Sequence, residues 1–199
     1  AHWLFGMFRS DPDSSRHKGL TFILVPLDTP GVTVRPIEKL NNKKAFAEVF
    51  FDDARVPVEY QLGEEGKGWD VAMATAGFER GLMLRSPARF QDTARRLVEL
   101  YKKTVASGQY VAPELRRTVA QCWMDAEAYA LNTYQTVAHL MGGGKIGAEA
   151  SLNKIFWSEL DTKMHETALK LLGYRAELLP GSPEAGDVGE WLDGYIFAL

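Results

Sequence analysis

The chain of 199 residues is 46% hydrophobic and carries 23 basic against 26 acidic residues, which gives a formal net charge of −3. This length and apolar content allow one large or two small domains with a buried core. The Lys and Arg residues are scattered among Asp and Glu, so neither a nucleic acid nor an anionic membrane surface is an expected partner.

The lone cysteine, Cys122, lies in an apolar stretch and cannot form an internal disulfide, which favours a reducing, cytoplasmic setting. No apolar run approaches the roughly 18 residues of a membrane span, and the first residues lack the order of regions typical of a signal peptide. Both ends are apolar, at residues 3–8 and 195–199, whereas domains normally end in polar segments. We therefore expect a soluble fragment of a longer protein.

The first part of the chain shows short apolar runs separated by turn-forming segments. These runs predict strands over residues 3–9, 20–27, 32–37 and 45–51. Closely spaced strands with no helix between them favour an antiparallel sheet in a barrel or a sandwich. Because four strands do not close a barrel, residues 1–61 are interpreted as the C-terminal part of a β domain.

The pattern changes its period in the stretch from Leu62 to Arg80. Glycines at positions 63, 66 and 68 permit the tight backbone of a strand-to-helix turn. From Trp69 onward, small or apolar residues recur at helical spacing. Glu79 falls on the same face as Thr75 and Ala76, so a carboxylate interrupts a face that otherwise has the pattern of a buried one.

Glu79 has two interpretations. A Glu followed by an Arg in a helix is usually solvated or paired with a basic neighbour. Alternatively, the small side chains of Thr75 and Ala76 leave room for a ligand, and an apolar slot raises the pKa of the carboxyl until it can take a proton from carbon. Arg80 points about 100° round the helix, where it would orient a substrate or hold an ion pair.

The rest of the chain reads as helical, with helices predicted over residues 69–84, 90–103, 114–141 and 148–172. Pro87 is expected to kink or end the first of them, and glycines end the last two. Long helices joined by short loops predict an up-and-down four-helix bundle over residues 62–199. The predicted fold class is α+β, with the end of an antiparallel barrel or sandwich followed by this bundle.

Several polar groups of the helical part are interpreted as structural. The GGGK segment at residues 142–145 lacks the spacing and the Ser/Thr of a phosphate-binding loop. His139 and His165 lack metal-ligand spacing and are expected to be partly exposed, so no metal site is predicted. A solvated face is expected for the scattered acidic residues of the last long helix, Glu159, Asp161 and Glu166.

Three stretches resemble the acyl-CoA dehydrogenase family. Residues 18–32 resemble the family's "KG(I/L)(S/T)xFxV…PGV" segment in its middle β domain. Residues 51–69 resemble its "F(E/D)DVxVPxxxxLGxxGxG" signature, where the β domain gives way to the C-terminal helices. Residues 150–173 resemble a later helix with the pattern "AS(I/M)xK…A…(L/Q)xxxG". The second match is the most specific, because its length, residues and position at a β-to-α switch all agree.

The resemblance implies a flavin enzyme that oxidises an acyl-CoA thioester to the trans-2-enoyl thioester. In such enzymes a carboxylate removes the α-proton while the β-hydrogen passes as a hydride to N5 of FAD. Isovaleryl- and long-chain-type members carry this base as a Glu immediately before an Arg in the first C-terminal helix, and Glu79-Arg80 matches that arrangement. Other members carry it just before the motif "GTxEIQR", which is absent from this chain. The implied partners are an electron-transfer flavoprotein and further subunits of a homo- or hetero-oligomer.

Two segments depart from the family pattern. Residues 102–108 lack the "RxxFG" element that contacts the FAD of a neighbouring subunit, and residues 169–175 keep only Gly173 of "QIxGGxG". Gly173 is thus the one candidate FAD contact. These departures suit a divergent subgroup in which unlike subunits share flavin sites, and leave open a non-catalytic partner subunit. A flavin monooxygenase or nitroalkane oxidase on the same scaffold also stays open, because fold does not fix chemistry.

Overall fold

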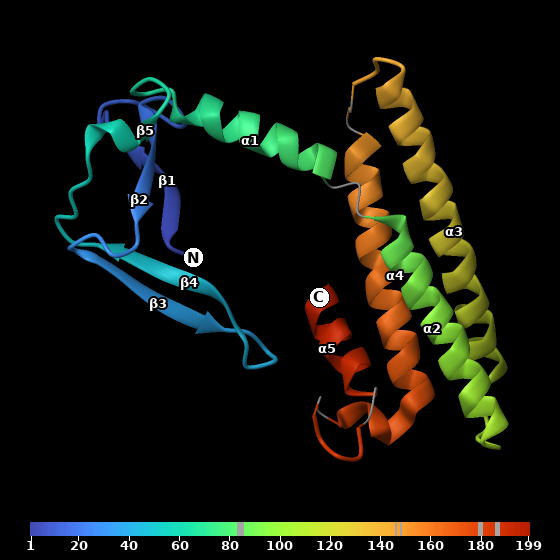
Figure 1. Cartoon of the computed structure of the whole chain (residues 1–199). Coiled ribbons are helices and arrows are strands. Elements are labelled where there is room, and N and C mark those ends of the chain that lie inside the picture. Colours follow the sequence, from blue (N-terminus) through green and yellow to red (C-terminus); the bar gives the residue numbers. More distant parts are fainter. Residues whose placement is uncertain (83–85, 146, 148, 179–180, 186–187) are drawn as a thin grey trace. The chain divides into compact units, whose positions relative to one another are not determined.

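The computed structural model describes residues 1–82, 86–145, 147, 149–178, 181–185 and 188–199, without the side chains of residues 78–82 and 149–150. It divides into two compact units, Ala1–Glu79 and Arg80–Leu199 (Figure 1). The domain boundary expected after residue 61 stays a prediction. None of the described helices is long and apolar enough to cross a membrane.

The first unit contains antiparallel strands, as the sequence predicts. Strands β1, β2 and β5 form one sheet, and β3 and β4 pair as a separate hairpin. The strands cover Trp3–Arg9 (β1), Leu20–Pro26 (β2), Val32–Glu38 (β3), Lys44–Phe51 (β4) and Gln61–Leu62 (β5), with a short 3-10 helix, η1, at Val58–Tyr60. Among the described residues these sheets close no barrel, so the expected barrel or sandwich is not confirmed.

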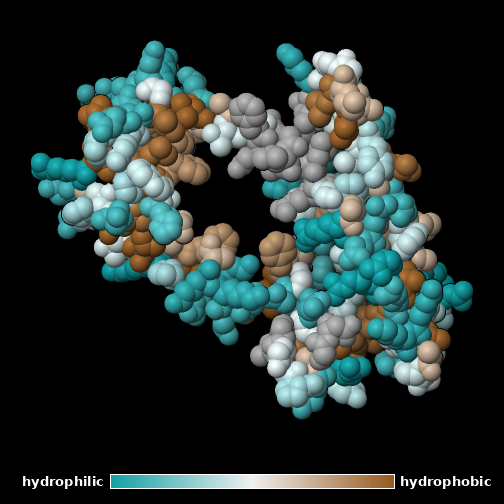
Figure 2. Space-filling model, in the orientation of Figure 1, coloured by the Kyte–Doolittle hydropathy of each residue, from teal (hydrophilic) through white to brown (hydrophobic). Residues whose placement is uncertain are grey.

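Many apolar side chains of these strands face the solvent. Phe5 in β1 is 63% exposed and Phe46 in β4 is 67% exposed. Figure 2 shows the hydrophobic, brown surface that results over the strand region. The described side chains that are buried in this unit gather on β2, at Thr21, Phe22 and Val25. The first unit is therefore built by strand pairing more than by a packed core.

The glycine-rich turn of residues 63–68 is fastened to β2. Gly63 and Gly66 have positive φ angles of 75° and 76°, which glycine adopts at no steric cost. The Gly66 N–H donates to the Thr21 hydroxyl oxygen at 2.9 Å. A Cβ at Gly68 would lie 2.6 Å from the backbone nitrogen of Phe22, so only glycine fits there. These contacts fix where the following helix, α1 (Gly68–Leu82), begins.

The second unit is helical. Its elements are α2 (Pro87–Ala106), α3 (Pro113–Met141), α4 (Glu149–Leu172), the 3-10 helix η2 (Gly173–Glu177) and α5 (Gly189–Ala198). Pro87 begins α2 rather than breaking a longer helix, because proline is well suited to the first helical position, where its missing N–H costs nothing. The helix α5 was not expected from the sequence. The predicted four-helix bundle includes α1, most of which belongs to the first unit, so the bundle stays a prediction.

The core of this unit lies between α2, α3 and α4. Phe90 and Leu97 from α2 meet Tyr129 from α3 and Met164 from α4, and each of these is at most 1% exposed. Phe90 contacts Tyr129 edge to face, with ring centroids 5.1 Å apart. Trp191 of α5, 4% exposed, extends the same core. Helical periodicity in the sequence thus becomes a continuous apolar interior.

Candidate functional site

Helix α1 carries the predicted catalytic pair. The backbones of Glu79 and Arg80 are helical, whereas both side chains lie outside the described residues. Thr75 and Ala76 are described, and their spacing from Glu79 puts all three on one helix face. The Thr75 hydroxyl is exposed and donates to the backbone oxygen of Val71 at 3.2 Å. Its proton is thereby occupied within the helix, and its oxygen is left to accept a hydrogen bond.

Gly173, the predicted FAD contact, begins η2. Its φ angle of +57° lies in the left-handed region that ends helices, and α4 ends at the residue before it. No atom lies within 4 Å of the place where a Cβ would be, so the glycine does not mark a close approach to other parts of the chain. Its observed role is helix termination, and its contact with FAD stays a prediction.

A cavity of about 240 Å³ lies close to Gly173, between α2, α4, η2 and α5. Leu100 and Trp191 contribute apolar walls, while Lys103 and Arg175 are exposed cations. Arg96, a third cation, is bound to Glu190 at 2.6 Å. Sequence reasoning missed this cavity, although the i, i+7 spacing of Arg96 and Lys103 signals one basic helix face.

The flavin implied by the resemblance does not fit within this cavity. Pockets for drug-sized ligands measure roughly 300–1,000 Å³, and FAD is larger than such ligands. This cavity alone therefore does not enclose FAD. No group of potential metal ligands occurs among the residues that the structure describes.

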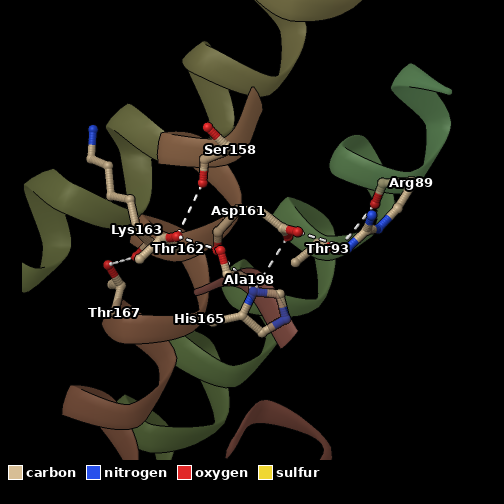
Figure 3. A network of polar contacts seen from close by, with 9 residues as sticks. All are labelled: Arg89, Thr93, Ser158, Asp161, Thr162, Lys163, His165, Thr167 and Ala198. Atoms are coloured by element: carbon tan, nitrogen blue, oxygen red, sulfur yellow. Dashed lines mark hydrogen bonds and ion pairs between the residues drawn. The ribbon is translucent and has the colours of Figure 1, made fainter. Parts of the chain in front are cut away.

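A polar network occupies the interior of the second unit, and we call its three members, Arg89, Asp161 and His165, the Asp161 network (Figure 3). Asp161 is 2% exposed, and Arg89 Nη2 donates to its Oδ2 at 2.7 Å. His165 Nδ1 donates to the backbone oxygen of Asp161 at 2.8 Å and lies 3.4 Å from its Oδ1. In the part of the chain that the structure describes, Oδ1 accepts no hydrogen bond.

This network corrects two expectations. Asp161 does not belong to a solvated face, and His165, at 9% exposure, is buried rather than partly exposed. Trp191 of α5 covers the imidazole with ring centroids 5.5 Å apart, and Arg89 of α2 donates to the Asp161 carboxylate at 2.7 Å. His139 is exposed. Because the sequence did not predict α5, the burial of the flank of α4 beneath it could not be predicted either.

Cys122 lies in the core and is 0% exposed. Burial raises the pKa of its thiol to about 11, with a smaller raising effect from Asp125 and a lowering effect from Lys163. The thiol stays protonated near neutral pH and is a poor nucleophile. We therefore expect Cys122 to be unreactive while the chain is folded.

Known proteins of one family are similar to this chain in sequence. A family model described as "Acyl-CoA dehydrogenase, C-terminal domain" matches residues 66–185. Two curated relatives, both named Acyl-CoA dehydrogenase IpdE1, are 36% identical over 100% of the chain in Mycolicibacterium smegmatis and 34% identical over 99% of it in Mycobacterium tuberculosis. The chain spans 48% and 49% of these relatives, about half of their length.

Solved structures show the same fold. The structure described as "Tcur3481-Tcur3483 steroid ACAD" aligns with 100% of this chain and 50% of its own, at a TM-score of 0.85 and 24% identity. An acyl-CoA dehydrogenase from Geobacillus kaustophilus aligns with 100% of this chain and 53% of its own, at a TM-score of 0.74 and 25% identity. With the family model covering more than half of its residues, the chain belongs to the acyl-CoA dehydrogenase family.

Proposed function

We propose that a protein containing this chain is an FAD-dependent acyl-CoA dehydrogenase that converts an acyl-CoA thioester to the trans-2-enoyl-CoA. The observation that carries the proposal is the match of the whole chain to two proteins named acyl-CoA dehydrogenase, at 36% and 34% identity. In this reaction the α-hydrogen leaves as a proton and the β-hydrogen leaves as a hydride. FAD, when bound, supplies the hydride acceptor, so the chain's own contribution is the base and the alignment of the substrate.

Glu79 is proposed as the base. Support comes from α1, whose helical backbone puts Glu79 on one face with Thr75 and Ala76. The small side chains on that face leave space for a thioester beside the carboxylate. In such a site, reduced solvation raises the pKa of the carboxyl and makes it a stronger base. Arg80 is proposed to bind and orient the substrate, with Thr75 and Ala76 lining its site.

Replacing Glu79 by Gln in the complete enzyme tests this role. The amide cannot accept the proton, so the rate of flavin reduction by acyl-CoA is expected to fall by about 100- to 10,000-fold. The FAD content per subunit, measured from flavin absorbance, is expected to stay unchanged. Asp70→Asn is the matched control, because Asp70 is an exposed carboxylate in the first turn of the same helix. Flavin reduction at the parent rate in Glu79→Gln would remove Glu79 from the mechanism.

A non-catalytic partner subunit is the second candidate function. The departures at residues 102–108 and 169–175 favour it, because they replace most of the residues with which the family pattern contacts FAD. Two structures with the same fold are described as pairs of unlike chains, Tcur3481-Tcur3483 and ChsE4-ChsE5. Measuring flavin per dimer, before and after mixing with a candidate partner, separates the two functions. Flavin bound only by the mixture supports a shared site, whereas stoichiometric flavin in a homo-oligomer excludes it.

A further inference from the structure

The Asp161 network is not explained by the stability of the helix core. A buried carboxylate with one oxygen lacking a hydrogen bond costs free energy, and apolar residues of similar volume often stabilise such positions better. The pair is also asymmetric, because the Asp161 side chain is 2% exposed and that of Arg89 is 35% exposed. Because apolar residues could replace this network without loss of stability, we expect its role in the parts of the chain that it contacts.

Three contacts run from the network and its neighbour Thr162 to α5. The Arg89 guanidinium carbon lies 5.5 Å from the ring centroid of Phe197. The His165 ring lies against Trp191, and a Cβ at Gly194 would overlap this ring. The Thr162 hydroxyl donates to the backbone oxygen of Ala198 at 3.3 Å (Figure 3). The network itself therefore contacts α5 at Trp191, Gly194 and Phe197.

Helix α5 depends on tertiary contacts to be a helix, and these contacts act beside the ion pair of Arg96 with Glu190. It has 10 residues, and isolated helices shorter than about 12–15 residues are marginal in water. Its docked side chains include Trp191, which also forms a wall of the cavity beside Lys103 and Arg175. Elements of a folded protein open locally as cooperative units, at free energies below that of global unfolding. Docking of α5 and closure of the cavity are thus one event.

We propose that the Asp161 network is a latch, which holds α5 against α2 and α4 and lets it detach as a unit while the α2–α4 core stays folded. Asp161 fixes the Arg89 guanidinium beside Phe197 and supplies the negative charge next to the His165 ring beneath Trp191. When the latch opens, Val188 and Trp191 leave the cavity wall and expose Leu100 and Leu171. The latch therefore gates this cavity, a property that goes beyond the proposed reaction.

Hydrogen exchange followed by mass spectrometry on the full 199-residue chain tests the latch. Asp161→Asn keeps the size of the side chain and removes its charge, which weakens a charge-assisted hydrogen bond. Amides of residues 189–198 are expected to exchange about tenfold faster, with less than about twofold change in α3. Glu114→Gln is the matched control, because it removes a carboxylate from an exposed pair with Arg117, and no change is expected in either region.

Two outcomes of the Asp161→Asn experiment overturn the latch. Equal acceleration in α2, α3, α4 and α5 would show that Asp161 stabilises the whole unit. Unchanged exchange in α5 would show that α5 does not depend on Asp161. If Asp161→Asn fails to fold, the double variant Arg89→Met/Asp161→Leu removes both charges without leaving one unpaired, and such replacements are usually tolerated. Faster exchange confined to α5 supports the latch in this variant, and α5 protection equal to the parent contradicts it.

The variant Gly194→Ala shows whether α5 is held by the charges of the network or by side-chain packing. The added methyl group displaces the His165 ring without altering any charge, so it is expected to loosen α5 as Asp161→Asn does. Loosening by Gly194→Ala alone, with α5 unchanged in both charge variants, would show that side-chain packing holds α5 and would overturn the latch.

Discussion

The two compact units use their apolar residues in opposite ways. In the second unit, apolar side chains at helical spacing meet in one interior, where Phe90, Leu97 and Tyr129 are at most 1% exposed. In the first unit, alternating apolar residues form well-paired strands, but Phe5 and Phe46 remain more than half exposed. The same kind of residue thus stabilises the helices by burial and contributes little burial to the sheets. Local pattern creates the strands, whereas tertiary packing creates the helical core.

Truncating one phenylalanine in each unit gives the largest expected contrast. Phe90→Ala removes a fully buried ring that contacts Tyr129, and should lower the free energy of unfolding by about 3–5 kcal/mol. Phe46→Ala removes a ring that is 67% exposed, and should change it by less than about 0.5 kcal/mol. Urea unfolding monitored by circular dichroism measures the first effect, and intrinsic fluorescence with proteolysis follows the second. A large loss in Phe46→Ala would show that this strand face is covered in solution.

The sequence predicted the positions of strands and helices in both units better than it predicted which side chains are buried. Strands expected at residues 3–9 and 32–37 lie at Trp3–Arg9 and Val32–Glu38, because alternation and turn residues are local signals. The helix expected from residue 114 begins at Pro113 for the same reason. Local signals do not show what covers a residue once the chain is folded. His165 was expected to be partly exposed, because its burial depends on Trp191 of α5, a short helix without a strong pattern of its own.

For the candidate site, too, the sequence showed residues of one helix but not the cavity between helices. A sequence motif singled out Glu79-Arg80, whose backbone lies in helix α1, and their roles stay predictions. The cavity beside Lys103 and Arg175 could not be predicted, because its walls come from four elements that are distant in sequence. Spacing finds residues that share one helix, whereas a cavity between helices requires the fold.

Replacing two glycines of α1 by alanine is expected to change the stability in opposite directions, one at the start of the helix and one in its interior. Gly68→Ala places a methyl group 2.6 Å from the backbone of β2, which cannot move aside, so a loss of about 1–3 kcal/mol is expected in the first unit. In Gly77→Ala the added methyl group meets no described atom within 4 Å beyond the backbone of its own helix, and should stabilise α1 by about 0.5–1 kcal/mol. Thermal unfolding of both variants, each against the parent chain, measures the difference. Stabilisation by Gly68→Ala would contradict the close packing of the turn against β2.

The smallest effect concerns pH and the core of the second unit. Burial raises the pKa of the Cys122 thiol from 9.0 to about 11, so the folded chain prefers the neutral thiol more strongly than the unfolded chain does. The stability that this preference supplies is complete below pH 9 and is lost as the pH rises towards 11. Urea midpoints measured from pH 8 to 11 should therefore fall more steeply in the parent than in Cys122→Ala, which cannot titrate there. Parallel curves would show that the thiolate is tolerated in the core. A thiol reagent at pH 8 should likewise react with Cys122 only after unfolding, because the folded core shields this sulfur from the solvent.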